Sequence, residues 1–158
     1  MPGIVVDAES KQRTFLPFAI IGSVCIVAGG LVSAALAHSP TEHAMWAVAY
    51  LVLVGGVAQI ALGAGWTWLT GRQAATSVST AELIAWNLGN AGVIAGTITD
   101  TTLVTDAGGV LLAAGLVIAL AATRGARAGW PLHGYRLLLL VVLISIPIGL
   151  ILARVTGG

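Results

Sequence analysis

The stretch ELIAWNLGNAGVIAGTITD, residues 82–100, decides the fold of this chain. Between its terminal acidic residues it carries no charge, yet it contains two asparagines, three glycines and a tryptophan. A helix that crosses the hydrocarbon core of a bilayer needs about 20 mostly apolar residues. The stretch therefore predicts a membrane-spanning helix that has polar groups to bury.

The composition of the whole chain is that of an integral membrane protein. Hydrophobic residues make up 58% of its 158 residues and charged residues only 8%, whereas about a quarter of an ordinary soluble domain is charged. The net charge is +1, and no basic patch interleaved with aromatic residues is present to bind phosphates. The expected partner is the lipid bilayer, and nucleic acid is not expected.

Five windows lack Asp, Glu, Lys and Arg, and each is long enough for one membrane helix. They predict an all-α fold, a bundle of five transmembrane helices at about 14–37, 43–69, 82–99, 106–123 and 135–155. These helices would form a single transmembrane domain, residues 14–158, behind a cytoplasmic N-terminal tail, residues 1–13. The third and fourth windows are near the lower length limit for a span, so a partly re-entrant pair is an alternative there.

The positions of Lys and Arg predict the orientation of the bundle, because cytoplasmic loops carry an excess of both residues. With the N-terminus in the cytoplasm, the cytoplasmic segments hold Lys11, Arg13, Arg72, Arg124, Arg127 and Arg136. The opposite side holds only Arg154. We therefore expect a multi-pass protein of the bacterial cytoplasmic membrane, with its C-terminus outside.

The helix predicted at 82–99 has two faces suited to packing. Its glycines share one face and its asparagines share a nearly opposite face. Small residues let membrane helices approach closely, and amides inside lipid seek hydrogen-bond partners. Gln59, at mid-depth of the second helix, is the natural partner of either asparagine. We expect this helix at the centre of the bundle, with a packing and polar core of Gln59, Asn87, Asn90, Gly89, Gly92 and Gly96.

The outer loop HSPTEH, residues 38–43, is a candidate metal or haem site. Imidazole, carboxylate and thioether groups bind copper, zinc or haem iron, and the loop region holds His38, Glu42, His43 and Met45. A proline turn separates the two histidines, so their spacing matches no established ligand pattern. The alternative is a polar turn in which Ser39 or Thr41 caps the next helix and Glu42 faces its positive end.

Two features lie at the cytoplasmic ends of the predicted helices. Glu82 is interpreted as a carboxylate at the start of its helix, with a proton or substrate relay into Asn87 as the alternative. The loop at 124–136 combines arginines with aromatic residues, which fits docking to anionic lipid or to a partner subunit. An ordinary positive-inside loop is the alternative for its residues Arg124, Arg127, Trp130 and Arg136.

No nucleophile with its base, phosphate loop or HExxH helix occurs in the sequence, so catalysis is not expected. We expect a small non-catalytic subunit, or an assembly or accessory factor, of a larger bacterial membrane complex. One alternative is a haem- or metal-binding membrane protein that uses the outer histidines. Another is a homo-oligomeric channel or carrier lined by Gln59, Asn87 and Asn90. The absence of a charge between the expected helix ends disfavours a carrier.

Overall fold

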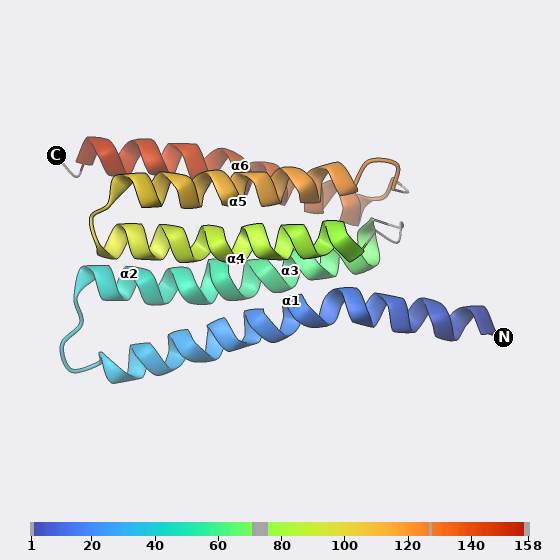
Figure 1. The fold of residues 1–158 in the computed structure, drawn as a ribbon, viewed down its shortest axis with the longest axis horizontal. Coiled ribbons are helices and arrows are strands. Elements are labelled where there is room, and N and C mark those ends of the chain that lie inside the picture. Colours follow the sequence, from blue (N-terminus) through green and yellow to red (C-terminus); the bar gives the residue numbers. More distant parts are fainter. Residues whose placement is uncertain (1, 71–75, 127, 157–158) are drawn as a thin grey trace. The chain divides into compact units, whose positions relative to one another are not determined.

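The computed structural model describes residues 2–70, 76–126 and 128–156, and this part of the chain is helical, with short turns and no strand (Figure 1). Its α-helices are α1 (Pro2–Ala35), α2 (Glu42–Tyr50), α3 (Gln59–Ala64), α4 (Thr76–Ile98), α5 (Thr102–Ala122) and α6 (Trp130–Thr156). Two π-helical segments, η1 (Leu51–Ala58) and η2 (Gly65–Leu69), make α2 and α3 parts of one continuous helix. The predicted all-α bundle of five helices is confirmed.

Four of these helices are long and apolar enough to cross a membrane. They are Ala8–Ala35, Glu42–Leu69, Thr102–Ala122 and Trp130–Ile151, so the chain has the character of a multi-pass membrane protein. The remaining helix, α4, has 23 residues and a length of about 35 Å, but it contains Glu82, Asn87 and Asn90. The helix from the stretch that decides the fold is therefore not among these four.

The helices begin earlier than the charge-free windows predicted. Helix α1 begins at Pro2, so residues 2–13 are its first turns where the sequence predicted a tail. Helix α4 begins at Thr76 instead of residue 82, and α6 at Trp130 instead of residue 135. Charged and polar side chains are costly in lipid but do not prevent helix formation. The windows therefore located the apolar part of each helix and missed its polar turns.

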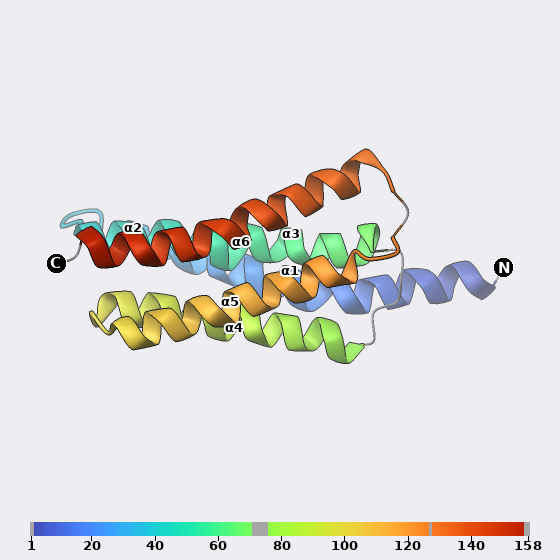
Figure 2. The same ribbon diagram turned by 90° about the horizontal axis from the view of Figure 1, so that it is seen from above.

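The helices group into two compact units, Met1–Trp68 and Leu69–Gly158, and the single transmembrane domain stays a prediction. The hairpin unit consists of α1 and the helix that continues through α2 and α3, which run antiparallel (Figure 1). The three-helix unit contains α4, α5 and α6. Helix α5 packs against both of its neighbours, and Figure 2 shows it beside α4 along its length.

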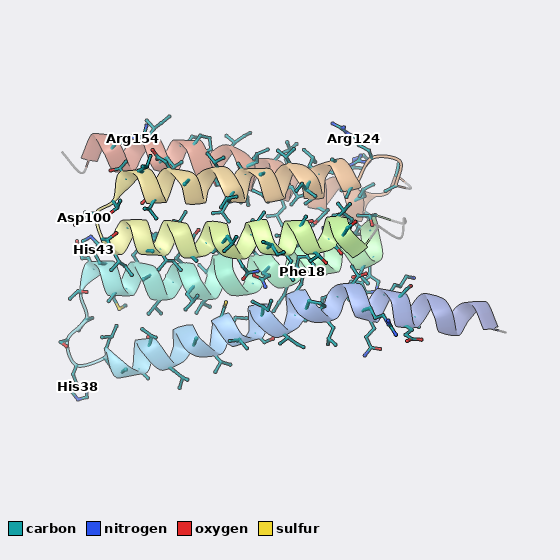
Figure 3. The ribbon with its side chains drawn as sticks, viewed as in Figure 1. Phe18, His38, His43, Asp100, Arg124 and Arg154 are labelled. Carbon is teal, nitrogen blue, oxygen red and sulfur yellow. The ribbon has the colours of Figure 1, made fainter. Side chains whose placement is uncertain are left out.

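Glycines bring the two helices of the hairpin unit together. Phe18 is buried between them and lies against Gly63 (Figure 3), where an added Cβ would come within 2.5 Å of the Phe18 Cβ. At Gly22, an added Cβ would lie 2.9 Å from the carbonyl oxygen of Gly56. The ring of Phe15 packs on Trp68 with the ring centroids 4.9 Å apart. The hairpin therefore closes on small residues along its length and on an aromatic pair at one end.

Two adjacent glycines of α5 each contact a different neighbouring helix in the three-helix unit. A Cβ added at Gly108 would meet the backbone of α4, and one added at Gly109 would lie 2.8 Å from Leu150 of α6. Successive helical residues are 100° apart around the axis, so the two positions face different directions. This pair lets α5 lie close to α4 and α6 at the same level.

Candidate functional site

The loop at residues 38–43 does not bring the predicted metal ligands together. His38 lies in the turn after α1 and His43 in the first turn of α2, and their exposed side chains do not point toward each other (Figure 3). Glu42 and Met45 are exposed as well. Across the described residues, no group of three or more His, Cys, Asp or Glu side chains could hold a metal ion. The geometry adds no support for a metal or haem site here.

The same loop caps a helix. The amide N–H of Ala44 donates to the Thr41 Oγ1 at 3.2 Å, and Glu42 lies in the first turn of α2. A hydroxyl at this position satisfies one of the amides left open at a helix start. The alternative of a capping turn therefore describes this loop.

Thr41→Ala should lower the free energy of unfolding of the protein by about 1 kcal/mol, because it removes this cap. Ser39→Ala is the matched control, since Ser39 is exposed in the same turn. Thermal unfolding of both variants in detergent, followed by circular dichroism, measures the difference. Equal unfolding midpoints for the two variants would show that the Thr41 hydroxyl does not stabilise α2.

The asparagines of α4 are bonded to their own helix. The side-chain amide of Asn87 donates to the carbonyl of Leu83 at 2.8 Å, and that of Asn90 donates to the carbonyl of Trp86 at 2.9 Å. Asn90 is buried and Asn87 is half-buried. Each Nδ2 group therefore has one of its two N–H donors bonded four residues back along α4, and the buried Asn90 Oδ1 has no hydrogen-bond partner among the described residues.

Gln59 is fully buried at the start of α3. Neither atom of its amide has a hydrogen-bond partner among the residues that the structure describes. The hydrogen bond predicted between Gln59 and an asparagine of α4 would join the hairpin unit to the three-helix unit, and it stays a prediction. An amide in this setting is costly until it finds a partner.

The glycine face of α4 lies against α5. A Cβ added at Gly92 would come within 3.0 Å of the Gly108 Cα, and one added at Gly96 would lie 3.0 Å from the carbonyl oxygen of Thr101. At Gly89 the nearest backbone atom, the Gly108 oxygen, would be 2.9 Å away. This face is therefore used inside the three-helix unit.

The arginines at the predicted cytoplasmic end have different roles. Arg124 is exposed after α5 (Figure 3), and Trp130 is 85% exposed at the first residue of α6. Arg127 lies outside the described residues. Arg136 donates from Nε to the Thr123 Oγ1 at 2.8 Å and from Nη2 to the Thr123 carbonyl oxygen at 2.5 Å. Since Thr123 is the C-cap of α5, Arg136 closes that helix, a role that the sequence analysis missed.

Glu82 is not at a helix start. Helix α4 begins at Thr76, and the Glu82 side chain, in the second turn, is fully buried. Ser79, three residues before it, and Trp86, four residues after it, are buried as well. Residues at this spacing share one face of a helix. The spacing could have predicted that Glu82 is buried, but the charge-free window began after Glu82 and left it out.

The predicted outer end of the three-helix unit contains an ion pair between Arg154 of α6 and Asp106 of α5. Both side chains are partly exposed, so the pair contributes at most about 1 kcal/mol. The nearby Asp100 has a φ of 50° and ends α4, with the Thr101 N–H donating to the Gly96 carbonyl at 2.8 Å. Both aspartates therefore have structural roles at helix ends.

No protein-family model matches the chain, and no curated protein or solved structure is significantly similar to it. The function proposed below is therefore argued from the polar side chains inside its helices.

Proposed function

We propose that the chain is a small non-catalytic subunit, or an assembly or accessory factor, of a larger complex in the bacterial cytoplasmic membrane. The observation that supports this role is how its helices use their polar side chains. Several hydroxyl and amide groups donate to a carbonyl three or four residues earlier in their own helix: Thr14, Thr67, Asn87, Asn90, Thr99 and Ser145. Donors bonded in this way are satisfied by the backbone of their own chain segment, which supports a structural role for them.

This pattern favours a scaffold over a channel. A pore lining must offer its donors and acceptors to the solute that passes. The Nδ2 groups of Asn87 and Asn90, which a channel would use, are bonded to the carbonyls of Leu83 and Trp86. One N–H donor of each amide is therefore unavailable to a pore lining, which supports the scaffold role over a homo-oligomeric pore.

The surfaces of α1 and α6 are suited to lipid or to a partner helix. Large apolar side chains are exposed at intervals of three or four residues along both helices. They include Val24, Val27 and Leu31 on α1, and Val141, Ile144, Ile148 and Ile151 on α6. A subunit embedded in a membrane complex needs such faces, because lipid covers some of them and other subunits cover the rest.

Purification from the native membrane in mild detergent tests the proposal. We expect the tagged chain to elute with larger proteins in a fixed ratio. A photo-crosslinking residue at Val27, which is 61% exposed, should capture the same protein, whereas one at Leu116, which is 1% exposed, should not. A monomer that crosslinks only to lipid would refute the proposal. A crosslink to a second copy of the chain would favour a homo-oligomer instead.

A further inference from the structure

The exposed face of α6 changes character along its length. Its first turn presents Trp130, which is 85% exposed, and the exposed His133. The exposed side chains that follow are aliphatic and lie three or four residues apart: Leu137, Val141, Ile144, Ile148 and Ile151. Residues at this spacing share one face of a helix. One stripe of α6 therefore has an aromatic and polar end followed by a long apolar part.

The length of this stripe fits a bilayer. The segment Trp130–Ile151 has 22 residues and so a length of about 33 Å, close to the roughly 30 Å of a hydrocarbon core. Tryptophan is enriched where a membrane meets water, because its ring is apolar and its N–H is polar. We therefore expect Trp130 at the level of the lipid headgroups and the aliphatic side chains of the stripe at the level of the acyl chains.

Arg124 adds an exposed positive charge at the same end of the three-helix unit. It directly follows Thr123, the C-cap of α5, and it points away from the helices (Figure 3). Thr123 accepts two hydrogen bonds, at 2.8 Å and 2.5 Å, from Arg136, which lies one turn after His133 in α6. These bonds hold the end of α5 beside the start of α6. Arg124 is therefore at the headgroup end of the stripe.

No acidic side chain balances this charge at the surface of the unit. Residues 107–158 contain no Asp or Glu. Asp100 and Asp106 lie at the opposite end of α5, and Glu82 is fully buried. No ion pair joins Arg124 to another described residue. The headgroup end of the stripe is therefore suited to an anion.

Arg136 contributes charge to this end of the unit, and Arg124 can contribute a direct contact. The Nε and Nη2 groups of Arg136 donate to the two oxygens of Thr123. Both acceptors are uncharged, so these bonds leave the positive charge of the guanidinium in place. The exposed guanidinium of Arg124 can instead donate to a phosphate, which arginine binds through charge-assisted hydrogen bonds.

We propose that this end of the three-helix unit binds an anionic phospholipid. Arg124 binds the phosphate of the headgroup, Trp130 packs at the level where headgroup and acyl chains meet, and the aliphatic stripe of α6 holds an acyl chain. The stripe by itself would accept any lipid. The unbalanced positive charge beside it selects a lipid with an anionic headgroup.

Native mass spectrometry of the purified chain measures which lipids it retains. From equal amounts of phosphatidylglycerol and phosphatidylcholine with the same acyl chains, we expect the chain to retain more phosphatidylglycerol. Arg124→Gln should lower the retained phosphatidylglycerol about fivefold, the factor that one basic residue contributes at an anionic lipid surface. Retained phosphatidylcholine should not change. Added inorganic phosphate should not displace the lipid, because it has no acyl chain to place on α6.

Arg13→Gln is the matched control for Arg124→Gln. Both arginines are exposed, but Arg13 is paired with Glu9 at 2.8 Å in the hairpin unit. This variant should retain phosphatidylglycerol as the wild type does. Equal retention of the two lipids by the wild type, an equal effect of the two substitutions, or displacement by inorganic phosphate would each overturn the proposal. The measurement uses the purified chain, so it does not depend on the scaffold role.

The stripe can also be probed in the native membrane. A photo-crosslinking residue at Leu137, which is 64% exposed, should capture lipid. Capture of a protein at this position would assign the stripe to a partner subunit and would overturn the lipid site.

Discussion

Gly108→Ala is expected to lower the free energy of unfolding of the three-helix unit by about 2–3 kcal/mol, as overpacking of a close contact does. A Cβ at this position would lie 2.6 Å from the nitrogen of Val93, 2.7 Å from the oxygen of Gly89 and 2.9 Å from the carbonyl carbon of Gly92. All three are backbone atoms of α4. Since no side chain can rotate away to relieve the clash, α4 and α5 must separate.

Gly149→Ala in α6 is the matched control for Gly108→Ala. It makes the same chemical change in a helix of the same unit, but no atom lies within 4 Å of the added Cβ. An alanine inside a helix is favoured over glycine by about 0.5–1 kcal/mol, so this variant should be neutral or slightly more stable. Unfolding by a denaturing detergent, followed by circular dichroism, measures both variants. Equal stability of the two would contradict the close contact between α4 and α5.

Arg136→Ala is expected to lower the free energy of unfolding by about 1.5–3 kcal/mol, the range for hydrogen bonds from a charged group. The change removes both bonds to Thr123, at 2.8 Å and 2.5 Å, and leaves the carbonyl at the C-cap of α5 without its guanidinium donor. Thr123 is 1% exposed, so water does not readily replace that donor. The end of α5 and the start of α6 should therefore loosen together.

Two further arginine variants distinguish capping from charge alone. Arg136→Lys keeps the charge, but an ammonium group cannot reproduce the two hydrogen bonds that the planar guanidinium makes to Thr123. It should therefore recover only part of the lost free energy of unfolding. Arg124→Ala removes a charge from an exposed site in the same region and should change stability by less than about 0.5 kcal/mol. Thermal unfolding in detergent checks these expectations. Full recovery by lysine would show that Arg136 acts only through its charge.

The sequence by itself determined the all-α membrane architecture and the number of helices. Each of its five charge-free windows overlaps one of the observed helices, because charged side chains are costly in the hydrocarbon core and are rare there. The glycine spacing of residues 89–96 also predicted a close-packing face on the third helix, and in the structure that face lies against α5.

Only the tertiary structure decided what the polar residues do. Hydropathy reports the cost of placing a group in lipid, but it does not report which neighbour compensates for that cost. Glu82 was placed at a helix start because the charge-free window began after it, whereas six residues of α4 precede it and the folded chain buries it. Arg136 was grouped with the docking residues, yet it caps α5, because α6 brings it beside Thr123. Such pairings depend on which helices lie side by side, and no local spacing in the chain specifies that.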